Sequence, residues 1–289
     1  MKIFVIGANG MAGHMIVNYL RSLPNTDVYA SIRGQSNHPK IFQLDLTNEK
    51  LTFEVLQQIR PDIVINAVGI LNDDTIKRLK EAIFINSLFP HILASYGDEL
   101  GFKLIHISTD CVFSGLKGKH KEDHPTDGTT VYAKTKSLGE VIDKRHVTIR
   151  TSIIGPELRK HGIGLFQWFM KQTGKIKGYQ HVFWNGVTTL ELSKAIAWII
   201  PHNIGGLVHL VGDSEISKCY LLNLLKDEFN KKDVQIVPST SEKSDKTLIN
   251  TRRDFTYKVP PYPTMIQELK QWMKENQKMY SHYINDGEE

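Results

Sequence analysis

Residues 2–13 read KIFVIGANGMAG and carry the strongest indication of the fold. An apolar run typical of a buried strand leads into three glycines in the spacing G-x-x-G-x-x-G, and a helical pattern follows. Glycine permits a tight bend, lets a pyrophosphate approach the backbone and lets the helix pack close to the strand. The first helical turn then offers free N–H groups and the positive end of the helix dipole. A tight turn without a ligand is the alternative. The residues expected to bind a dinucleotide here are Gly7, Asn9, Gly10, Met11 and Gly13.

Short apolar runs alternate with helical patterns through the first half of the chain. This alternation predicts βαβ units with right-handed crossovers, and therefore an α/β fold with a parallel sheet. The expected strands are Ile3–Ile6, Val28–Ile32, Ile63–Val68, Phe102–Ile107 and Val147–Thr151. The expected helices lie near 11–23, 48–59, 74–98 and 132–144.

After about residue 150 the strict alternation weakens. We interpret residues 1–155 as a nucleotide-binding domain, and residues 156–289 mainly as a smaller substrate-binding lobe with some elements that return to the main sheet. The helices expected in this half lie near 164–173, Thr189–Ile200, 216–229 and 263–278. A strand is expected at Gly206–Val211, and the glycine-spaced stretch TGKIKGYQHVFWNG at 173–186 is left without an element.

The composition is that of an ordinary globular protein, with 40% hydrophobic and 23% charged residues among 289. A formal charge of +5 is too small to indicate a nucleic-acid partner. The two cysteines do not suggest a disulfide framework, and no apolar stretch approaches the length of a membrane span. The chain enters a strand within two residues, without a basic leader. We therefore expect no membrane partner and a cytoplasmic location.

The second strand helps to choose the cofactor. NAD-binding folds usually place an acid at the end of this strand, on the ribose 2′-hydroxyl. Here Asp27 stands at its start, while Ser31 and Arg33 stand at its end. An arginine suits a 2′-phosphate, so we expect NADPH, with NADH as the alternative. The structural alternative is that Arg33 is only a solvated loop residue, in which case it does not indicate the cofactor. Asp45 in the run QLDLT is expected to contact the adenine amino group.

Tyr132 and Lys136 lie four residues apart in VYAKTK, so a helix would place them on one face. The pKa of a free tyrosine, near ~10, is too high for an acid that works at neutral pH. A nearby ammonium would favour the phenolate and lower that pKa; at ~4 Å and an effective dielectric of ~20 the attraction is about 4 kcal/mol. Thr109 precedes this pair at the end of a strand, where open α/β sheets bind ligands. It would help to stabilise an alkoxide on the substrate.

These motifs together resemble the extended short-chain dehydrogenases and, within them, the dTDP-4-dehydrorhamnose reductase family. The resemblance rests on GANGMAG at 7–13, NAVGILN at 66–72, STDCVFSG at 108–115, YAKTKSLGE at 132–140 and RTSIIGPE at 150–157. It covers about the first 160 residues well and the rest more loosely. It implies a Rossmann-type, doubly wound parallel sheet with a smaller C-terminal substrate-binding lobe.

The resemblance also implies residue roles. Thr109, Tyr132 and Lys136 would be the catalytic triad, and Lys136 would also hold the nicotinamide ribose. Tyr132 would deliver a proton while hydride reduces the C4 ketone of a nucleotide-linked 4-keto-6-deoxy sugar in bacterial surface polysaccharide synthesis. Extended members are often dimers, which makes a homodimer one option. The further residues expected to bind the cofactor are Leu46, Ala67, Val68, Gly69 and Asn86.

Two positions depart from the family pattern. Some rhamnose-pathway reductases carry a glutamate after the glycine turn that contributes to a magnesium-linked dimer; here the position is Met15, so we expect no metal. Those enzymes also tend to carry an aromatic residue near the sugar where this chain has Ile153. The stretch FWNGVTTLEL at 183–192 looks like that of related reductases in polysaccharide clusters. UDP-4-keto-6-deoxy-N-acetylglucosamine is therefore a candidate substrate beside dTDP-4-dehydrorhamnose.

Several polar and aromatic residues are expected near the substrate, each with a structural alternative. Arginine suits bidentate phosphate contacts, but the pair in NTRRDF could also be solvated. A threonine before a helix can instead serve as its N-cap. The histidines show no metal spacing. The residues expected to contact the substrate are Thr109, Asp110, Ile153, Trp184, Thr188, Arg252 and Arg253.

Two other functions remain open at this point. One is a nucleotide-sugar epimerase or dehydratase of the same fold, which would normally need an acid at the end of the second strand and extra acid or base residues beside Thr109. The other is a non-catalytic, NADP-binding regulatory subunit. The presence of both Tyr132 and Lys136 favours an enzyme.

Overall fold

A seven-stranded parallel sheet forms the centre of the molecule in a computed structural model that describes residues 1–160 and 162–284. The strand order β10-β6-β5-β4-β1-β2-β3 reverses direction between β1 and β4, which is the arrangement of a doubly wound sheet. The predicted α/β, Rossmann-type fold class is therefore confirmed. The strands are β1 (Lys2–Ile6), β2 (Asp27–Ile32), β3 (Ile41–Gln43), β4 (Ile63–Asn66), β5 (Lys103–Thr109), β6 (Val147–Thr151) and β10 (Gly206–His209).

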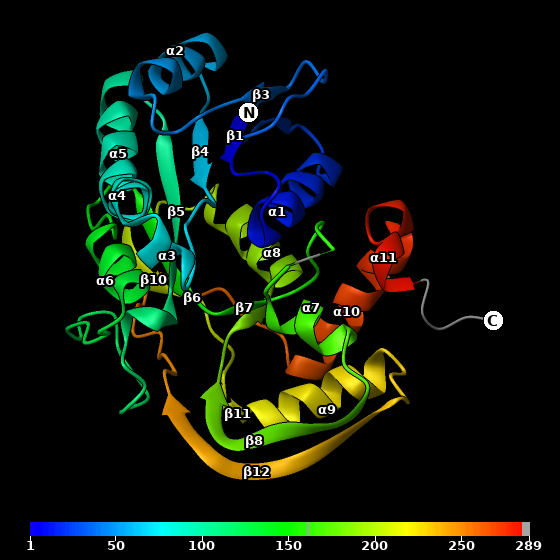
Figure 1. The fold of residues 1–289 in the computed structure, drawn as a ribbon. Coiled ribbons are helices and arrows are strands. Elements are labelled where there is room, and N and C mark those ends of the chain that lie inside the picture. Colours follow the sequence, from blue (N-terminus) through cyan, green and yellow to red (C-terminus); the bar gives the residue numbers. More distant parts are fainter. Residues whose placement is uncertain (161, 285–289) are drawn as a thin grey trace.

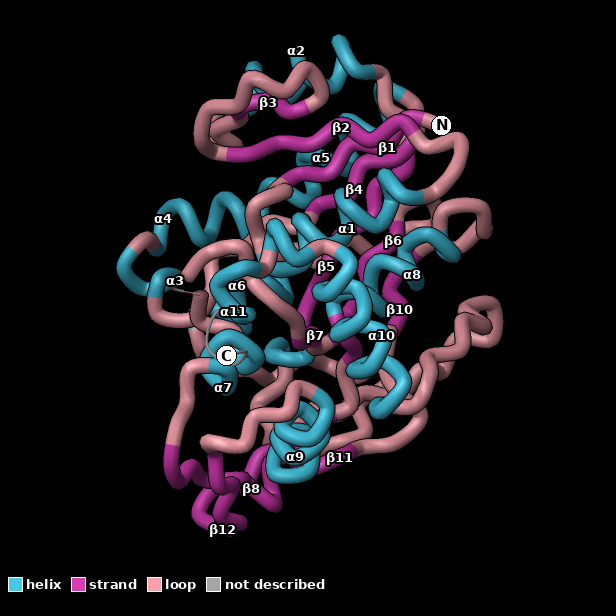
Figure 2. Tube along the Cα trace, turned by 90° about the vertical axis from the view of Figure 1, so that its right-hand side faces the viewer, coloured by secondary structure: helices cyan, strands magenta, loops and turns pink. Residues whose placement is uncertain are grey.

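Helices cover both faces of this sheet. Figure 1 shows the sheet between α5 (Phe89–Leu100) on the left and α1 (Met11–Ser22) and α8 (Thr189–Ile199) on the right. Figure 2 looks onto the side of α1, α8 and α10 (Tyr262–Glu275). The alternating side chains of a strand serve both faces: Ile3 and Val5 pack toward α1, whereas Phe4 and Ile6 pack toward α2 (Glu49–Ile59) and α5.

The helical region after β4 is less regular than predicted. The single helix expected near 74–98 is divided into α3 (Asp74–Lys77), α4 (Leu79–Ala82), the π-helix η1 (Ile83–Leu88) and α5. The break falls at Arg78, whose backbone leaves the helical region (φ −124°, ψ 48°). π-Turns are rare and often mark functional sites, and this one contains Asn86.

The helix expected at 132–144 is shorter than predicted: α6 spans Val131–Leu138. It begins with Thr130, whose side chain accepts a hydrogen bond from the N–H of Ala133 (3.1 Å). It ends because the chain passes close against η1. A Cβ atom at Gly139 would lie only 1.9 Å from the backbone oxygen of Asn86, so no larger residue fits there.

The second half builds a small lobe and also returns to the main sheet. β8 (Gly174–Trp184) occupies the stretch that was left unassigned, and it lies between β11 (Ile216–Ser217) and β12 (Val234–Asp245), with α9 (Lys218–Glu228) packed against it. Figure 1 shows this lobe below the main sheet. β10 and α8 belong to the main sheet and its covering layer. The remaining elements are β7 (Ile153–Ile154), β9 (Val187–Thr188), η2 (Asp110–Val112), α7 (Leu165–Met170), η3 (Gln277–Met279) and α11 (Ser281–Ile284).

The glycine turn has the close packing that its sequence predicts. Gly7 has φ +92°, a conformation that residues with a side chain rarely adopt. A Cβ atom at Gly13 would lie 2.1 Å from the backbone oxygen of Gly7. The start of α1 therefore touches the turn that leaves β1, and it can do so only without a side chain.

Gly13→Ala should lower the free energy of unfolding by about 1–3 kcal/mol, because the methyl group overlaps a backbone atom that cannot move freely. Helix propensity alone would favour alanine by about 1 kcal/mol, so a net loss identifies the clash. Urea unfolding measures it. The matched control is Gly34→Ala, where a Cβ atom meets nothing within 4 Å; its effect should stay within about 0.5 kcal/mol. Equal stability of the two variants would contradict the predicted clash.

Candidate active site

The carboxyl ends of β1, β4 and β5 meet at one edge of the sheet, where its winding reverses. The loops after β1 and β4 touch there, since a Cβ atom at Gly7 would lie 2.4 Å from Cγ2 of Val68. Ala67, Val68 and Gly69 are half-buried beside this contact. The predicted cofactor residues of both loops therefore come together in one place.

The start of α1 fits a dinucleotide phosphate. The N-cap residue of α1 is Gly10, which has no side chain to cap the helix. The helical hydrogen bonds begin only with the N–H of His14, which donates to the oxygen of Gly10 (3.1 Å). The N–H groups of residues 11–13 therefore have no acceptor within the helix. Asn9 and Gly10 are exposed at its mouth. An anion can approach these donors directly.

The residues around the end of β2 lie next to the glycine turn. Ser31 is buried and its Oγ accepts from the N–H of Gly7 (3.4 Å), so it supports the glycine turn. Arg33 is exposed and near enough to Asp45 to contribute to lowering the pKa of that carboxyl, although hydrogen bonds from Thr47 lower it more. Asp45 Oδ1 already accepts from the N–H and hydroxyl of Thr47 (3.0 and 2.8 Å). Leu46, which stands between Asp45 and Thr47 in the sequence, is buried.

Asn86 is fully buried and ties the loop after β4 to α6. Its Oδ1 accepts from the N–H of Ile70 (2.8 Å), and its Nδ2 donates to the oxygen of Ile70 (2.9 Å) and to Oγ1 of Thr135 (3.1 Å). Both amide hydrogens are thus in use. Asn86 therefore holds the loop that contains Gly69 in place.

Tyr132 and Lys136 point from α6 toward the end of β5, as their spacing predicts. Nζ of Lys136 donates to the backbone oxygen of Ile107 (2.8 Å) and lies 3.3 Å from Nε2 of His106. Thr109, the last residue of β5, lies close enough to Tyr132 to act on its phenol, while its own Oγ1 donates to Oδ1 of Asp110 (3.2 Å) and accepts from the N–H of Cys111 (3.1 Å). The three residues of the predicted triad therefore lie together at the carboxyl end of β5.

His106 is a buried part of this arrangement that the sequence reasoning missed. Burial, and next the charge of Lys136, hold the pKa of His106 well below its ordinary value, so the ring is neutral. Its Nδ1 lies 3.1 Å from Nδ2 of Asn66 at the end of β4. Its signal in the sequence was a histidine within the apolar run FKLIHIS.

The protonation of the pair differs from the expectation. Burial lowers the pKa of Lys136 to about 8, with Glu140 acting in the opposite direction. Burial raises the pKa of Tyr132, and the ammonium of Lys136 does not offset this because it is directed at Ile107 and His106. The predicted lowering of the tyrosine pKa is therefore absent from the structure. The phenol holds its proton throughout the neutral range, which is the state a proton donor needs.

A buried ion pair holds the elements around the triad. Glu140 follows α6 and Arg150 lies on β6; Nε and Nη2 of Arg150 donate to the carboxylate at 2.9 and 2.6 Å. Oγ of Ser108, the neighbour of Thr109, donates to the same carboxylate (2.7 Å). Both charged side chains are at least 96% buried. The pair therefore links α6, β5 and β6 behind the triad.

The structure brings some predicted substrate residues to this place. Asp110 follows Thr109 directly and is half-buried. Trp184 is buried, and its Nε1 donates to Oγ of Ser152 (2.9 Å), next to half-buried Ile153. The indole is therefore held in place beside Ile153.

Other predicted substrate residues do not join the cluster. Thr188 caps α8, since its Oγ1 accepts from the N–H of Glu191 (3.1 Å). Arg252 pairs with Asp254 and donates to the oxygen of Leu207 (3.1 Å), near the amino end of β10 and away from the carboxyl ends of the strands. Arg253 is exposed beside it.

Two lysines of the lobe lie in the cluster although no motif indicated them. Nζ of Lys218 lies 5.3 Å from the centroid of the Trp184 ring and near Asp110. Nζ of Lys246 lies 3.8 Å from Sγ of Cys111. Their sequence surroundings, SEISKCY and SDKTL, carry no functional signal.

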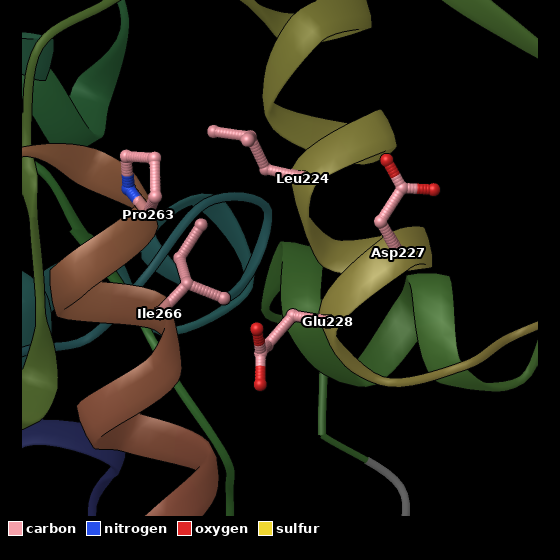
Figure 3. Close-up of a pocket in the computed structure, with 5 residues that line it drawn as sticks. All are labelled: Leu224, Asp227, Glu228, Pro263 and Ile266. Atoms are coloured by element: carbon pink, nitrogen blue, oxygen red, sulfur yellow. The ribbon is translucent and has the colours of Figure 1, made fainter.

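A separate small cavity lies outside this cluster. It has a volume of about 220 Å³ and lies between the last turns of α9 and the start of α10. Figure 3 shows Leu224, Asp227 and Glu228 on one side and Pro263 and Ile266 on the other. It is at the end of α9 opposite Lys218. None of its lining residues belongs to the predicted site.

Within residues 1–160 and 162–284, no three His, Cys, Asp or Glu side chains gather in a way that would hold a metal ion. Met15 is completely buried in α1. In the same part of the chain, no helix has the length and apolar character that a membrane crossing requires.

The sequence profile of the family described as "RmlD substrate binding domain" matches residues 1–281. The chain belongs to this family. The resemblance inferred from the five motifs is thereby confirmed.

Individual relatives agree with this family. The chain is 26% identical over 254 residues to the spore coat polysaccharide biosynthesis protein SpsK of Bacillus subtilis (strain 168), covering 85% of this chain and 86% of the relative. It is 27% identical over 157 residues to a dTDP-4-dehydrorhamnose reductase of Aggregatibacter actinomycetemcomitans, covering 52% and 51%. The fold is similar to that of the dTDP-4-dehydrorhamnose reductase of Bacillus anthracis strain Ames, solved in complex with NADP: the TM-score is 0.79 at 20% identity, covering 94% and 99% of the two chains.

Glu140→Ala should lower the free energy of unfolding by about 3–5 kcal/mol, because it leaves Arg150 buried without its carboxylate. The double variant Glu140→Leu, Arg150→Met should lose much less, since it removes both charges. Chemical denaturation of the three proteins gives the comparison. A double variant as unstable as the single one would show that the pair does more than cancel its own charges.

The affinity for NADPH should fall by roughly three- to tenfold as the pH rises through about 8, because Lys136 then loses the ammonium that would hold the ribose. Lys136→Arg keeps its charge and should bind NADPH with no such pH dependence. Fluorescence titration measures the affinity, with Lys134→Gln, an exposed lysine on the same helix, as the control. A flat profile in the unmodified protein would contradict this role.

Proposed function

We propose that this protein is an NADPH-dependent reductase of the C4 ketone of a nucleotide-linked 4-keto-6-deoxy sugar. The observation that carries the proposal is the grouping of Thr109, Tyr132 and Lys136 beside an uncapped, glycine-lined helix start. A proton donor and a dinucleotide-binding surface therefore adjoin the same edge of the sheet. The family supports the proposal because its relatives include dTDP-4-dehydrorhamnose reductases.

The cofactor residues follow from the fit of the glycine turn to a dinucleotide. The N–H groups at the start of α1 would bind the pyrophosphate, Arg33 the 2′-phosphate, and the loop Ala67–Gly69 the middle of the cofactor. When bound, the cofactor supplies a hydride to the sugar carbonyl. The NADP complex of the similar Bacillus anthracis structure supports this choice of cofactor.

Tyr132 is the proposed proton donor. Reduction turns the carbonyl oxygen into an alkoxide, and a phenol that retains its proton at neutral pH can donate it to that oxygen. Thr109 lies close to the same phenol and would hold the oxygen within reach of the proton. Lys136 lies too deep to donate directly, so its proposed task is to hold the ribose from beneath.

The sugar itself is proposed in two forms, dTDP-4-dehydrorhamnose and UDP-4-keto-6-deoxy-N-acetylglucosamine. Ile153 stands where related reductases tend to carry an aromatic side chain, and it leaves a smaller wall beside Trp184. This favours the UDP-linked N-acetyl sugar. Similarity over most of the chain to a spore coat polysaccharide biosynthesis protein supports a role in making surface polysaccharide.

The reductase assay follows loss of the absorbance of NADPH with UDP- and dTDP-linked 4-keto-6-deoxy sugars. One sugar should turn over, and Tyr132→Phe should lower kcat by about a thousandfold because the proton donor is gone. NADPH binding should stay within about twofold of the unmodified protein, since the phenyl ring keeps its shape.

Two results would count against the proposal. Turnover that survives in Tyr132→Phe would remove Tyr132 from the proton step. Tight NADPH binding without turnover of any sugar in the panel would instead favour a regulatory subunit that binds NADP.

A further inference from the structure

The strand pairing of the small lobe places both Lys218 and Lys246 near the end of β5. In the small sheet β11-β8-β12, Ser217 of β11 and Asp245 of β12 both pair with Phe183 of β8, from opposite sides. Lys218 is the next residue after Ser217, and Lys246 is the next residue after Asp245. The lobe therefore places one lysine on each side of the end of β8, where the chain passes into Trp184.

The surroundings hold both lysines toward the main sheet. Lys218 lies over the ring of Trp184, with its Nζ 5.3 Å from the ring centroid. The stem of Lys246 passes over Gly115, where a Cβ atom would come within 3.3 Å of Cε. Its Nζ lies 3.8 Å from Sγ of Cys111, one residue beyond Asp110. Two lobe residues thus meet the end of β5 across the cleft.

The charges in this cluster do not balance. Among the described residues, no carboxylate oxygen lies within 4.0 Å of either ammonium nitrogen. Burial lowers the pKa of Lys218 to about 8, so it is still mainly protonated at neutral pH, and the charge of Asp110 acts in the opposite direction without forming a contact ion pair. Burial raises the pKa of the Cys111 thiol to about 11, so Cys111 adds no negative charge. One carboxylate therefore faces two ammonium groups in a half-buried cleft, which leaves one positive charge for a ligand.

We propose that Lys218 and Lys246 form the binding site for the diphosphate of the nucleotide-sugar substrate. This rests on the proposed function, because a nucleoside diphosphate is the anion that such a substrate brings to the cleft. The site lies between Trp184 and the loop after β5, so the diphosphate binds against the lobe and the sugar extends toward Tyr132. A lysine ammonium is a usual phosphate ligand, and two of them match two phosphate groups.

The test measures binding and not turnover. Calorimetric titration with UDP, UMP and uridine, and with dTDP, is done on the full chain and on Lys218→Gln, Lys246→Gln and the double variant. Each single variant should weaken UDP binding by roughly tenfold and leave uridine binding unchanged, because only the phosphate contacts are lost. Lys218→Arg should keep most of the affinity.

The matched control is Lys243→Gln, an exposed lysine on β12 three residues before Lys246. It removes the same net charge from the same lobe and should bind UDP like the unmodified protein. NADPH affinity in all variants should also be unchanged, which excludes a general loss of folding.

The outcomes separate this proposal from the reductase assignment. Lysine-dependent UDP binding in a protein that reduces no sugar would support the diphosphate site while the reductase assignment fails. Equal UDP affinity in all variants would overturn the diphosphate site even if the protein is a reductase. Weakening of UDP and uridine by the same factor, or no nucleotide binding by the unmodified protein, would overturn it as well.

Discussion

The buried ammonium of Lys136 is the interaction on which the site depends. A charge taken out of water is stable only where acceptors surround it. Here the backbone oxygen of Ile107 accepts from it, and the neutral ring of His106 lies 3.3 Å away; both belong to β5. This contact ties α6 to β5. Tyr132, one helical turn earlier, takes its place at the end of β5 as a consequence.

The same requirement explains the polar network behind the triad. Glu140 and Arg150 are almost completely buried, and each has its partner. Ser108 donates to Glu140, and Asn86 donates its two amide hydrogens to the loop after β4 and to α6. Every one of these contacts joins two different elements. The reactive groups stand on a support whose polar atoms are already satisfied, which leaves the surface above it free for ligands.

The two sides of the cleft are built by different means. The main sheet brings its residues together because parallel strands end at one edge, a property of the topology. The lobe brings Lys218 and Lys246 together because β11 and β12 pair with the same residue of β8. Neither lysine belongs to a motif, and they lie 28 positions apart in the sequence. Such a pair is visible only when the strand pairing is known.

The sheet, the glycine turn and the grouping of Tyr132 with Lys136 could be predicted from the sequence, because these features follow local rules. Apolar runs define strands, Gly7 and Gly13 fit only one kind of turn, and the spacing of Tyr132 and Lys136 places them on one helix face. It did not predict β12, whose residues are mostly exposed and polar and so lack the alternation of a half-buried strand. The rise in the pKa of Tyr132 and the hydrogen bonds that occupy the amide of Asn86 could be known only from the folded structure. The same holds for the position of Arg252 away from the site, and for the position of Lys218 and Lys246 near the end of β5. These depend on burial and on contacts between distant segments, and no local pattern encodes either.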